Sequence, residues 1–181
     1  MRPDGKVSIN DSHASAHAEL AHYYRVASDY AAAHEQGSIA RALDPNSAEA
    51  QNVMAFIFLC LNQPKEALTA APNAMRMSPG APEFYLIATA DAQMMLRRFD
   101  EALPLLARIL GRRPRWLMAR AMATICLEAL GRHDEANAMA MELLELSPNF
   151  SVQRWRRCLH NPDRPDTAQS ADMLKAAGIP A

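Results

Sequence analysis

Apolar residues recur along the chain with the spacing of amphipathic helices, in stretches that are interrupted by prolines. Four such stretches have a proline at their end, namely Pro45, Pro79, Pro114 and Pro148. An alanine stands twelve residues before each proline, at Ala33, Ala67, Ala102 and Ala136, so that consecutive alanines are 34, 35 and 34 residues apart. Twelve residues before each alanine lies another small residue in a separate apolar stretch: Ala21, Ala55, Ala90 or Thr124. The pattern predicts four units of two helices each.

Close packing explains this pattern. A small side chain at a helix crossing lets two antiparallel helices approach, while larger neighbours fill the flanks. Proline cannot continue a helix interior, so each of the four prolines marks the end of a second helix. Gly37 is expected to weaken the second helix of the first unit, because glycine is a poor helix former. The sequence therefore predicts an all-α fold of antiparallel helix pairs that stack side by side.

The period, the small-residue positions and the turns RRFDEA (97–102) and GRHDEA (131–136) resemble tetratricopeptide (TPR) repeats over about residues 14–148. The resemblance implies a right-handed α-solenoid, or TPR-like superhelix, with C-terminal capping helices. The expected organisation is a polar N-terminal lead-in at 1–13, helix pairs at about 14–46, 47–80, 81–115 and 116–149, and capping helices with a tail at 150–181.

The tail has features of its own. Its apolar spacing predicts a helix at about 151–159 and another at about 167–177, which would cap the exposed apolar face of the last unit. Residues 147–157 and 171–180 also resemble the end of TPR regions that are appended to bacterial class III adenylate cyclases. No cyclase catalytic sequence lies in this chain, so this second resemblance implies a sensor-like or docking appendage, a relative of such regions, or an excised C-terminal piece.

Composition and charge exclude several classes of protein. With 50% hydrophobic residues, 6 glycines and a net charge of -1, the chain is neither disordered nor collagen-like, and no overall charge attracts nucleic acid or an anionic membrane. The longest apolar run, 53–61, is far shorter than the roughly 20 residues of a membrane-spanning helix. Residues 1–20 lack the apolar stretch of a secretory signal, so we expect none. We expect a cytoplasmic protein without a membrane segment.

In a TPR-like solenoid the first helices of the units line a concave groove, which usually holds a peptide or a partner helix. The residues predicted to line this groove are His22, Arg25, Asn52, Phe56, Leu59, Phe84, Ile87, Asp91, Met94, Met118, Ile125 and Glu128. The expected partner is a protein or peptide of unknown identity. Alternatively, the N-terminal segment, the last helix or a second copy of the chain covers several of these residues, and the last case is self-association.

No catalytic, cofactor or metal site is predicted. His13 and His17 have the spacing of a zinc pair, but no third ligand can be placed. Three cysteines without a C-x-x-C pair are typical of inert core residues. Acidic pairs recur at the start of two second helices, where they complement the helix dipole: Asp100 with Glu101, and Asp134 with Glu135.

The stretch 97–157 contains eleven arginines and seven acidic residues, and Arg112, Arg113 and Arg115 surround Trp116. Such a cluster can bind nucleic acid. Because acids are mixed with the arginines and the rest of the chain is net negative, we do not predict nucleic-acid binding, and an acidic protein partner fits at least as well.

We therefore predict a noncatalytic TPR scaffold that binds a protein or peptide in its concave groove. Two alternatives stay open. Chains of this size with about three TPR units resemble bacterial type III secretion chaperones. The resemblance of the tail implies a regulatory TPR region of an adenylate cyclase or another signalling protein.

Overall fold

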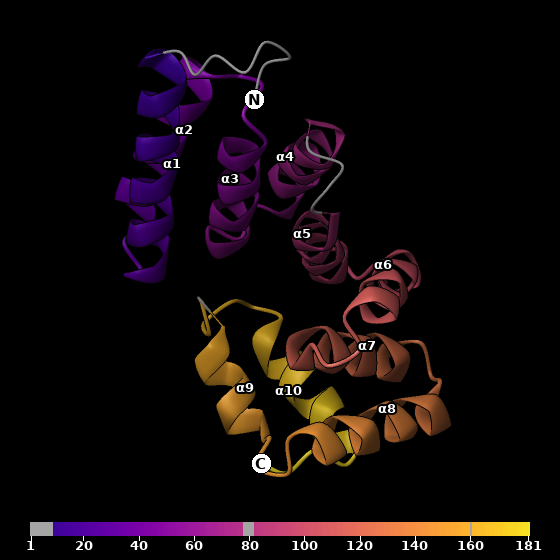
Figure 1. The fold of residues 1–181 in the computed structure, drawn as a ribbon. Helices are drawn as coiled ribbons and strands as arrows, with labels where there is room; N and C mark the ends of the chain where they lie inside the picture. Colours follow the sequence, from indigo (N-terminus) through magenta and orange to yellow (C-terminus); the bar gives the residue numbers. More distant parts are fainter. Residues whose placement is uncertain (1–8, 78–81, 160) are drawn as a thin grey trace. The chain divides into compact units, whose positions relative to one another are not determined.

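The computed structural model describes residues 9–77, 82–159 and 161–181, and these residues form ten α-helices and no β-strand (Figure 1). The predicted all-α fold is confirmed. The helices are α1 (Ile9–Val26), α2 (Tyr30–Leu43), α3 (Ala48–Cys60), α4 (Pro64–Met77), α5 (Pro82–Met95), α6 (Phe99–Arg112), α7 (Leu117–Ala129), α8 (His133–Leu146), α9 (Val152–Cys158) and α10 (Thr167–Ala176). Helix α1 begins within the predicted lead-in. The predicted boundary at 80 and 81 and the lead-in before residue 9 lie outside the described residues.

In each helix pair, the turn between the two helices contains one residue with a left-handed backbone conformation. Ser28, Asn62 and Arg97 have φ angles of 63°, 58° and 61°, and Gly131 holds the equivalent place in the fourth pair with a φ of 72°. These four positions follow the same spacing as the alanines. Only glycine adopts this conformation without steric cost, so the first three pairs form the turn at some expense.

Side-chain caps fix the start of three helices. The side chains of Asp29, Ser47 and Ser151 accept hydrogen bonds from backbone N–H groups in the first turns of α2, α3 and α9, at 3.1, 3.1 and 3.2 Å. Such caps satisfy backbone donors that a helix start leaves free. Helices α6 and α8 lack a side-chain cap bond and instead carry two acids each in the first turn, as the recurring acidic pairs predicted.

The chain divides into two compact units, Met1–Ala88 and Thr89–Ala181. In the first unit α1 packs on α2 and α3, α2 packs on α3, and α3 packs on α4. This order is that of helix pairs stacked on their neighbours. The core consists mainly of small and medium side chains: Ala18, Ala21, Ala33, Ala40, Ala50, Val53, Met54 and Ile57.

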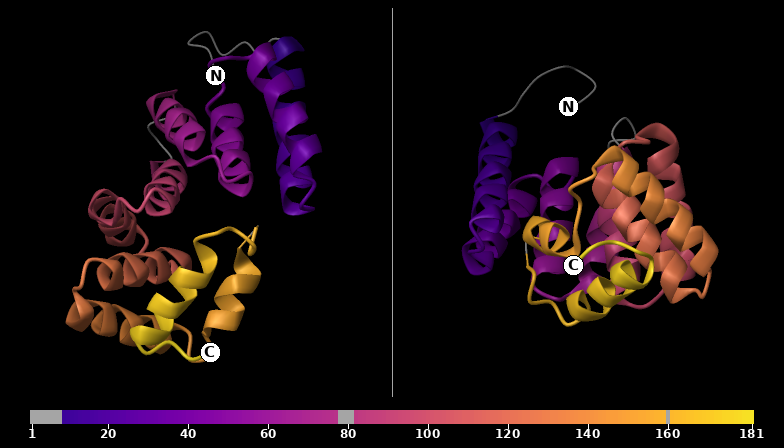
Figure 2. Two further views of the ribbon diagram at one scale, coloured as in Figure 1. Left: turned by 180° about the vertical axis from the view of Figure 1, so that it is seen from behind. Right: turned by 90° about the horizontal axis from the view of Figure 1, so that it is seen from below.

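In the second unit α7 packs on α6, α8 and α10, and α10 also packs on α9 (Figure 2). The last helix therefore returns to lie on a first helix of its own unit. Its buried side includes Leu174, and the following Ile179 is buried as well. The backbone N–H of Val152 donates to the carbonyl of Pro180 at 2.8 Å, which joins the end of the segment to the start of α9.

Candidate functional site

The predicted groove residues lie on the first helices of the helix pairs, α1, α3, α5 and α7. Their exposure differs widely. Leu59, Ile87, Met94 and Ile125 are buried and pack within the protein, so they do not line a surface in this structure. Phe84 is 45% exposed, His22 is exposed, and Asn52, Phe56 and Met118 are half-buried.

Arg164 forms an ion-pair cluster with two carboxylates, Asp91 and Asp166, which we call the Arg164 cluster. Its Nη1 and Nη2 donate to the two carboxylate oxygens of Asp91, both at 2.9 Å. Its Nε and Nη2 donate to Asp166 at 3.1 and 2.8 Å. Only 11% of the Arg164 side chain is exposed, against 25% for Asp91. Burial alone would lower the pKa of Arg164, but Asp91 and then Asp166 outweigh it and the pKa is raised.

The Arg164 cluster changes the interpretation of the second unit. Asp91 is a predicted groove residue, and it is already bound by the chain's own C-terminal segment. The side chain of Glu128, another predicted groove residue, is buried and accepts a hydrogen bond from Nδ1 of His133 at 2.8 Å. With α10 packed on α7, the segment 164–179 occupies the side of this unit on which Asp91 lies. Arg164 itself lies before α10, in the segment that leads into the last helix.

Sequence reasoning did not find Arg164. Its partner Asp91 is 73 residues away, and no periodicity relates the two positions. The local sequence Arg164-Pro165-Asp166 indicates a turn with a charge pair, but it does not indicate a third residue.

Arg25 lies on the first unit in a different setting. Only 5% of this residue is exposed. Its Nη2 donates to Nδ1 of His22 at 3.3 Å, and its guanidinium lies over the Phe56 ring, 5.3 Å from the centroid. Nε and Nη1 are buried and have no hydrogen-bond partner. Burial lowers the pKa of Arg25, and the groups that oppose this are Cys60 and Tyr30 rather than a carboxylate.

Asn52 lies one helical turn before Phe56 on α3, and its Oδ1 is also buried without a hydrogen-bond partner. We call His22, Arg25, Asn52 and Phe56 the Arg25 cluster. It therefore combines unsatisfied donors, an unsatisfied acceptor and an aromatic ring, on two first helices that pack against each other. Buried polar atoms in proteins are normally paired, so such a group of exceptions indicates a binding site or bound water.

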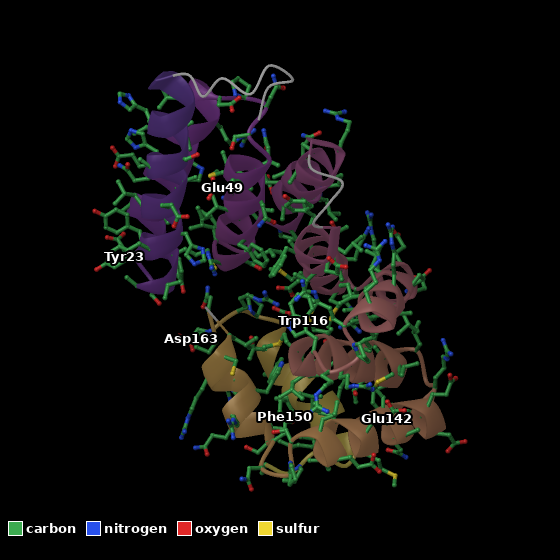
Figure 3. The ribbon with its side chains drawn as sticks, in the orientation of Figure 1. Tyr23, Glu49, Trp116, Glu142, Phe150 and Asp163 are labelled. Carbon is green, nitrogen blue, oxygen red and sulfur yellow. The ribbon has the colours of Figure 1, made fainter. Side chains whose placement is uncertain are left out.

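Helix α1 also carries exposed apolar residues. Leu20, Tyr23 and Val26 are all substantially exposed. Tyr23 points away from α2 and α3 (Figure 3). Its ring makes an edge contact with Tyr24, with centroids 5.6 Å apart.

Several arginines of the stretch 97–157 have structural roles. Arg120 pairs with Glu142 and donates to the carbonyl of Pro114 at 3.0 Å. Arg132 binds Glu135 at 2.7 Å. The guanidinium of Arg113 lies 5.9 Å from the ring centroid of Trp116, which Figure 3 labels together with Glu142. Some arginines of this stretch therefore contact acidic side chains or an aromatic ring of the same chain.

The remaining predicted features are placed as follows. Nδ1 of His17 contacts Oε1 of Gln36 at 2.7 Å, and His13 is exposed. The described residues include no group of three or more His, Cys, Asp or Glu side chains that could hold a metal ion. Cys60 and Cys126 are buried as predicted, but Cys158 is exposed, because α9 buries only Val152 and Trp155. Among the described helices, none has the length and apolar character that crossing a membrane requires.

Comparisons with solved structures show the fold. The chain is similar to YrrB, described as a TPR protein with an unusual peptide-binding site, with a TM-score of 0.63 and 20% identity over 89% of this chain and 82% of that one. It is similar to PilW, a type IV pilus biogenesis factor, with a TM-score of 0.71 and 20% identity over 90% and 75%. It is also similar to MamA from Desulfovibrio magneticus RS-1, with a TM-score of 0.68 and 12% identity over 91% and 93%.

No family model and no curated protein matches the sequence. The solved structures nevertheless confirm the predicted fold class, a TPR-like α-solenoid of antiparallel helix pairs with C-terminal capping helices.

Proposed function

We propose that this protein is a noncatalytic interaction scaffold of the TPR type that binds a segment of another protein on the first helices of its first unit. The observation that carries the proposal is the Arg25 cluster, in which a buried guanidinium lies over the half-buried Phe56 ring and polar atoms of Arg25 and Asn52 have no hydrogen-bond partner. In the second unit the C-terminal segment binds Asp91 and packs on α7.

Further observations support binding over catalysis. The Arg25 cluster offers a half-buried aromatic ring, which is the kind of anchor that dominates protein interfaces. YrrB, which shares the fold, is described as having a peptide-binding site. Nothing in the Arg25 cluster combines a nucleophile with a base, as a catalytic site would. We place the protein in the cytoplasm, as its sequence predicts.

The test is affinity capture with variants of the first helices. We expect Phe56→Ala and Phe84→Asp to reduce capture of the principal partner by about tenfold or more, because each alters an aromatic side chain on the proposed surface. Met141→Asp is the matched control, since Met141 is an exposed apolar residue on α8, a second helix. The proposal fails if both variants stay folded by circular dichroism and retain the partner at the level of the Met141→Asp control.

The two alternatives, a type III secretion-like chaperone and a regulatory TPR region of an adenylate cyclase or signalling protein, remain predictions. Secretion genes beside the coding sequence would favour the first. A reading frame that continues upstream into a catalytic domain would favour the second. Self-association is a separate question, and light scattering on the purified protein answers it.

A further inference from the structure

We propose that a hollow between the end of α2 and the start of α3 is a binding site for a free amino acid, whose carboxylate pairs with Arg41 and whose ammonium group donates to Gln51. The site shares no residue with the Arg25 cluster and goes beyond the proposed binding of a protein segment. It follows from three features of the described residues: a cavity, a cation without an ion pair and a buried acceptor without a donor.

The hollow has a volume of about 270 Å³, and its lining residues are Ser38, Arg41, Ala42, Pro45 and Gln51. The first three lie on α2 at positions i, i+3 and i+4, so they share one face of that helix. Pro45 lies in the connection that follows, and Gln51 is on α3. At roughly 30 Å³ for each water molecule, the hollow holds about nine waters, which is the space that a small organic molecule needs.

Arg41 brings a positive charge to the hollow. It lies in the last turn of α2 and is half-buried. None of the hydrogen bonds and ion pairs among the described residues involves Arg41, whereas Arg120 and Arg164 each bind a carboxylate. The five N–H donors of its guanidinium are therefore available to a ligand. A carboxylate offers two acceptor oxygens in a plane that matches the guanidinium.

Gln51 brings an acceptor. Only 6% of this residue is exposed, and its Oε1 is buried without a hydrogen-bond partner. Buried polar atoms in proteins are normally paired. Nε2 of Gln51 donates to the carbonyl of Pro45 at 3.3 Å, which is longer than the usual 2.9–3.0 Å, so a small rotation of the amide can bring Oε1 to a ligand in the hollow. An acceptor requires a donor, so the ligand must carry N–H or O–H groups.

A free amino acid meets both requirements. Its carboxylate accepts from Arg41, and its ammonium group has three donors, one of which suits Oε1 of Gln51. The hydroxyl of Ser38 donates or accepts, so it can bind either end of the ligand. Ala42 and Pro45 give an apolar wall to the side chain, and the volume of the hollow favours a small one. Acetate lacks the ammonium donors, and methylammonium lacks the carboxylate.

The position of the hollow makes the binding measurable without a partner protein. A molecule that contacts both Arg41 and Gln51 connects α2 of the first helix pair with α3 of the second, and these two helices pack on each other. A ligand that binds only the folded protein raises the Tm.

The experiment measures the Tm of the full chain at constant pH and ionic strength, with each of the common amino acids at about 10 mM. Acetate, methylammonium and inorganic phosphate are the comparison probes. Arg41→Met removes the cation and Gln51→Met removes the acceptor, and both keep the length of the side chain. Arg76→Gln is the matched control, since Arg76 is an exposed arginine of the first unit that contacts Asn73 at 3.2 Å and does not line the hollow.

We expect an amino acid with a small side chain to raise the Tm of the parent and of Arg76→Gln by about 3 °C or more, and acetate and methylammonium to have no such effect. Arg41→Met should lose the shift, and Gln51→Met should reduce it. The inference is wrong if no amino acid raises the Tm, if acetate or phosphate raises it as much, or if Arg41→Met keeps the shift. None of these results bears on the proposed function, because no partner protein is present.

Discussion

At the scale of single residues, the surroundings of each buried ionisable group decide its chemistry. Cys126 is fully buried on α7, and the charge of Asp91 acts on it. Burial, followed by this negative charge, raises the pKa of the Cys126 thiol to about 12. The thiolate form is therefore disfavoured in the folded protein, and Cys126 acts as a small apolar core residue.

This raised pKa predicts how stability changes with pH. In the unfolded chain a cysteine releases its proton near pH 8.5. Folded Cys126 holds its proton up to about pH 12, so between these values the unfolded state binds fewer protons and the free energy of unfolding falls as pH rises. Cys126→Ala lacks this effect. Its stability deficit relative to the parent should therefore shrink above pH 9, by about 1.4 kcal/mol per pH unit at most.

Urea unfolding of both proteins at pH 7.5 and pH 10 measures the two deficits. All other ionisable groups are common to both proteins, so their effects cancel in the comparison. A deficit that is the same at both pH values would contradict the assignment of the raised pKa.

At the scale of helices, Gly37 shows why a poor helix former stands in the middle of α2. The helix continues without interruption from Tyr30 to Leu43. A Cβ atom at Gly37 would lie 2.4 Å from Sδ of Met54 and 3.2 Å from its Cγ. Met54 itself is buried on α3. The glycine therefore lets Met54 pack against the backbone of α2, and the residue that weakens one helix brings two helices together.

Gly37→Ala should destabilise the protein by about 1–3 kcal/mol, because the methyl group displaces a fully packed Met54 side chain. The matched substitution is Gly111→Ala in the last turn of α6. No atom lies within 4 Å of the added Cβ there, so this change should stabilise by about 0.5–1 kcal/mol through helix propensity. Chemical denaturation of the two variants checks both signs. Equal effects of the two substitutions would contradict the packing role of Gly37.

The helix pairs were predictable because each pair carries its own local signals. The alanines at the crossings and the prolines after the second helices fall at fixed positions, and Ala33, Ala102 and Ala136 are fully buried. The docking of the C-terminal segment was not predictable to the same degree. The tail was expected to cap the last unit, but its ion pair joins Arg164 to Asp91 on α5, and three helices, α6 to α8, lie between α5 and the tail. Side-chain pairing over such a distance leaves no periodic trace in one sequence.

The candidate site shows the same division. First-helix spacing correctly placed Arg25, Asn52 and Phe56 on α1 and α3, where the structure finds contacts and unpaired atoms. The same spacing also selected Leu59 and Ile125, which are buried. Periodicity identifies the helix face. How far a neighbouring helix covers that face depends on tertiary packing, which spacing does not encode.

At the scale of the whole molecule, the chain forms two compact units, and each has helices that pack mainly on their neighbours in sequence. Among the described helices, α1 also packs on α3, and α10 packs across a longer separation in sequence on α7. In a fold of nearest-neighbour contacts, a local change destabilises its own region most. Regional stability can therefore be tested with one buried side chain of α10.

Leu174→Ala should lower the free energy of unfolding of the second unit by about 2–5 kcal/mol, because Leu174 is fully buried in that unit. Hydrogen exchange measured by mass spectrometry should show faster exchange in residues 89–181 than in 9–77 relative to the parent. Leu130→Ala is the control, since Leu130 is exposed at the end of α7 and its loss should change stability by about 0.5 kcal/mol or less. Uniform acceleration over the whole chain would contradict regional unfolding.

The Arg164 cluster also has a consequence for handling the protein at the bench. Its charges are largely shielded from solvent, so dissolved ions screen them far less than they screen exposed pairs such as Arg132 with Glu135. A wash with concentrated sodium chloride on a chromatography column should therefore remove weakly bound contaminants without disrupting the packing of α10 on α7.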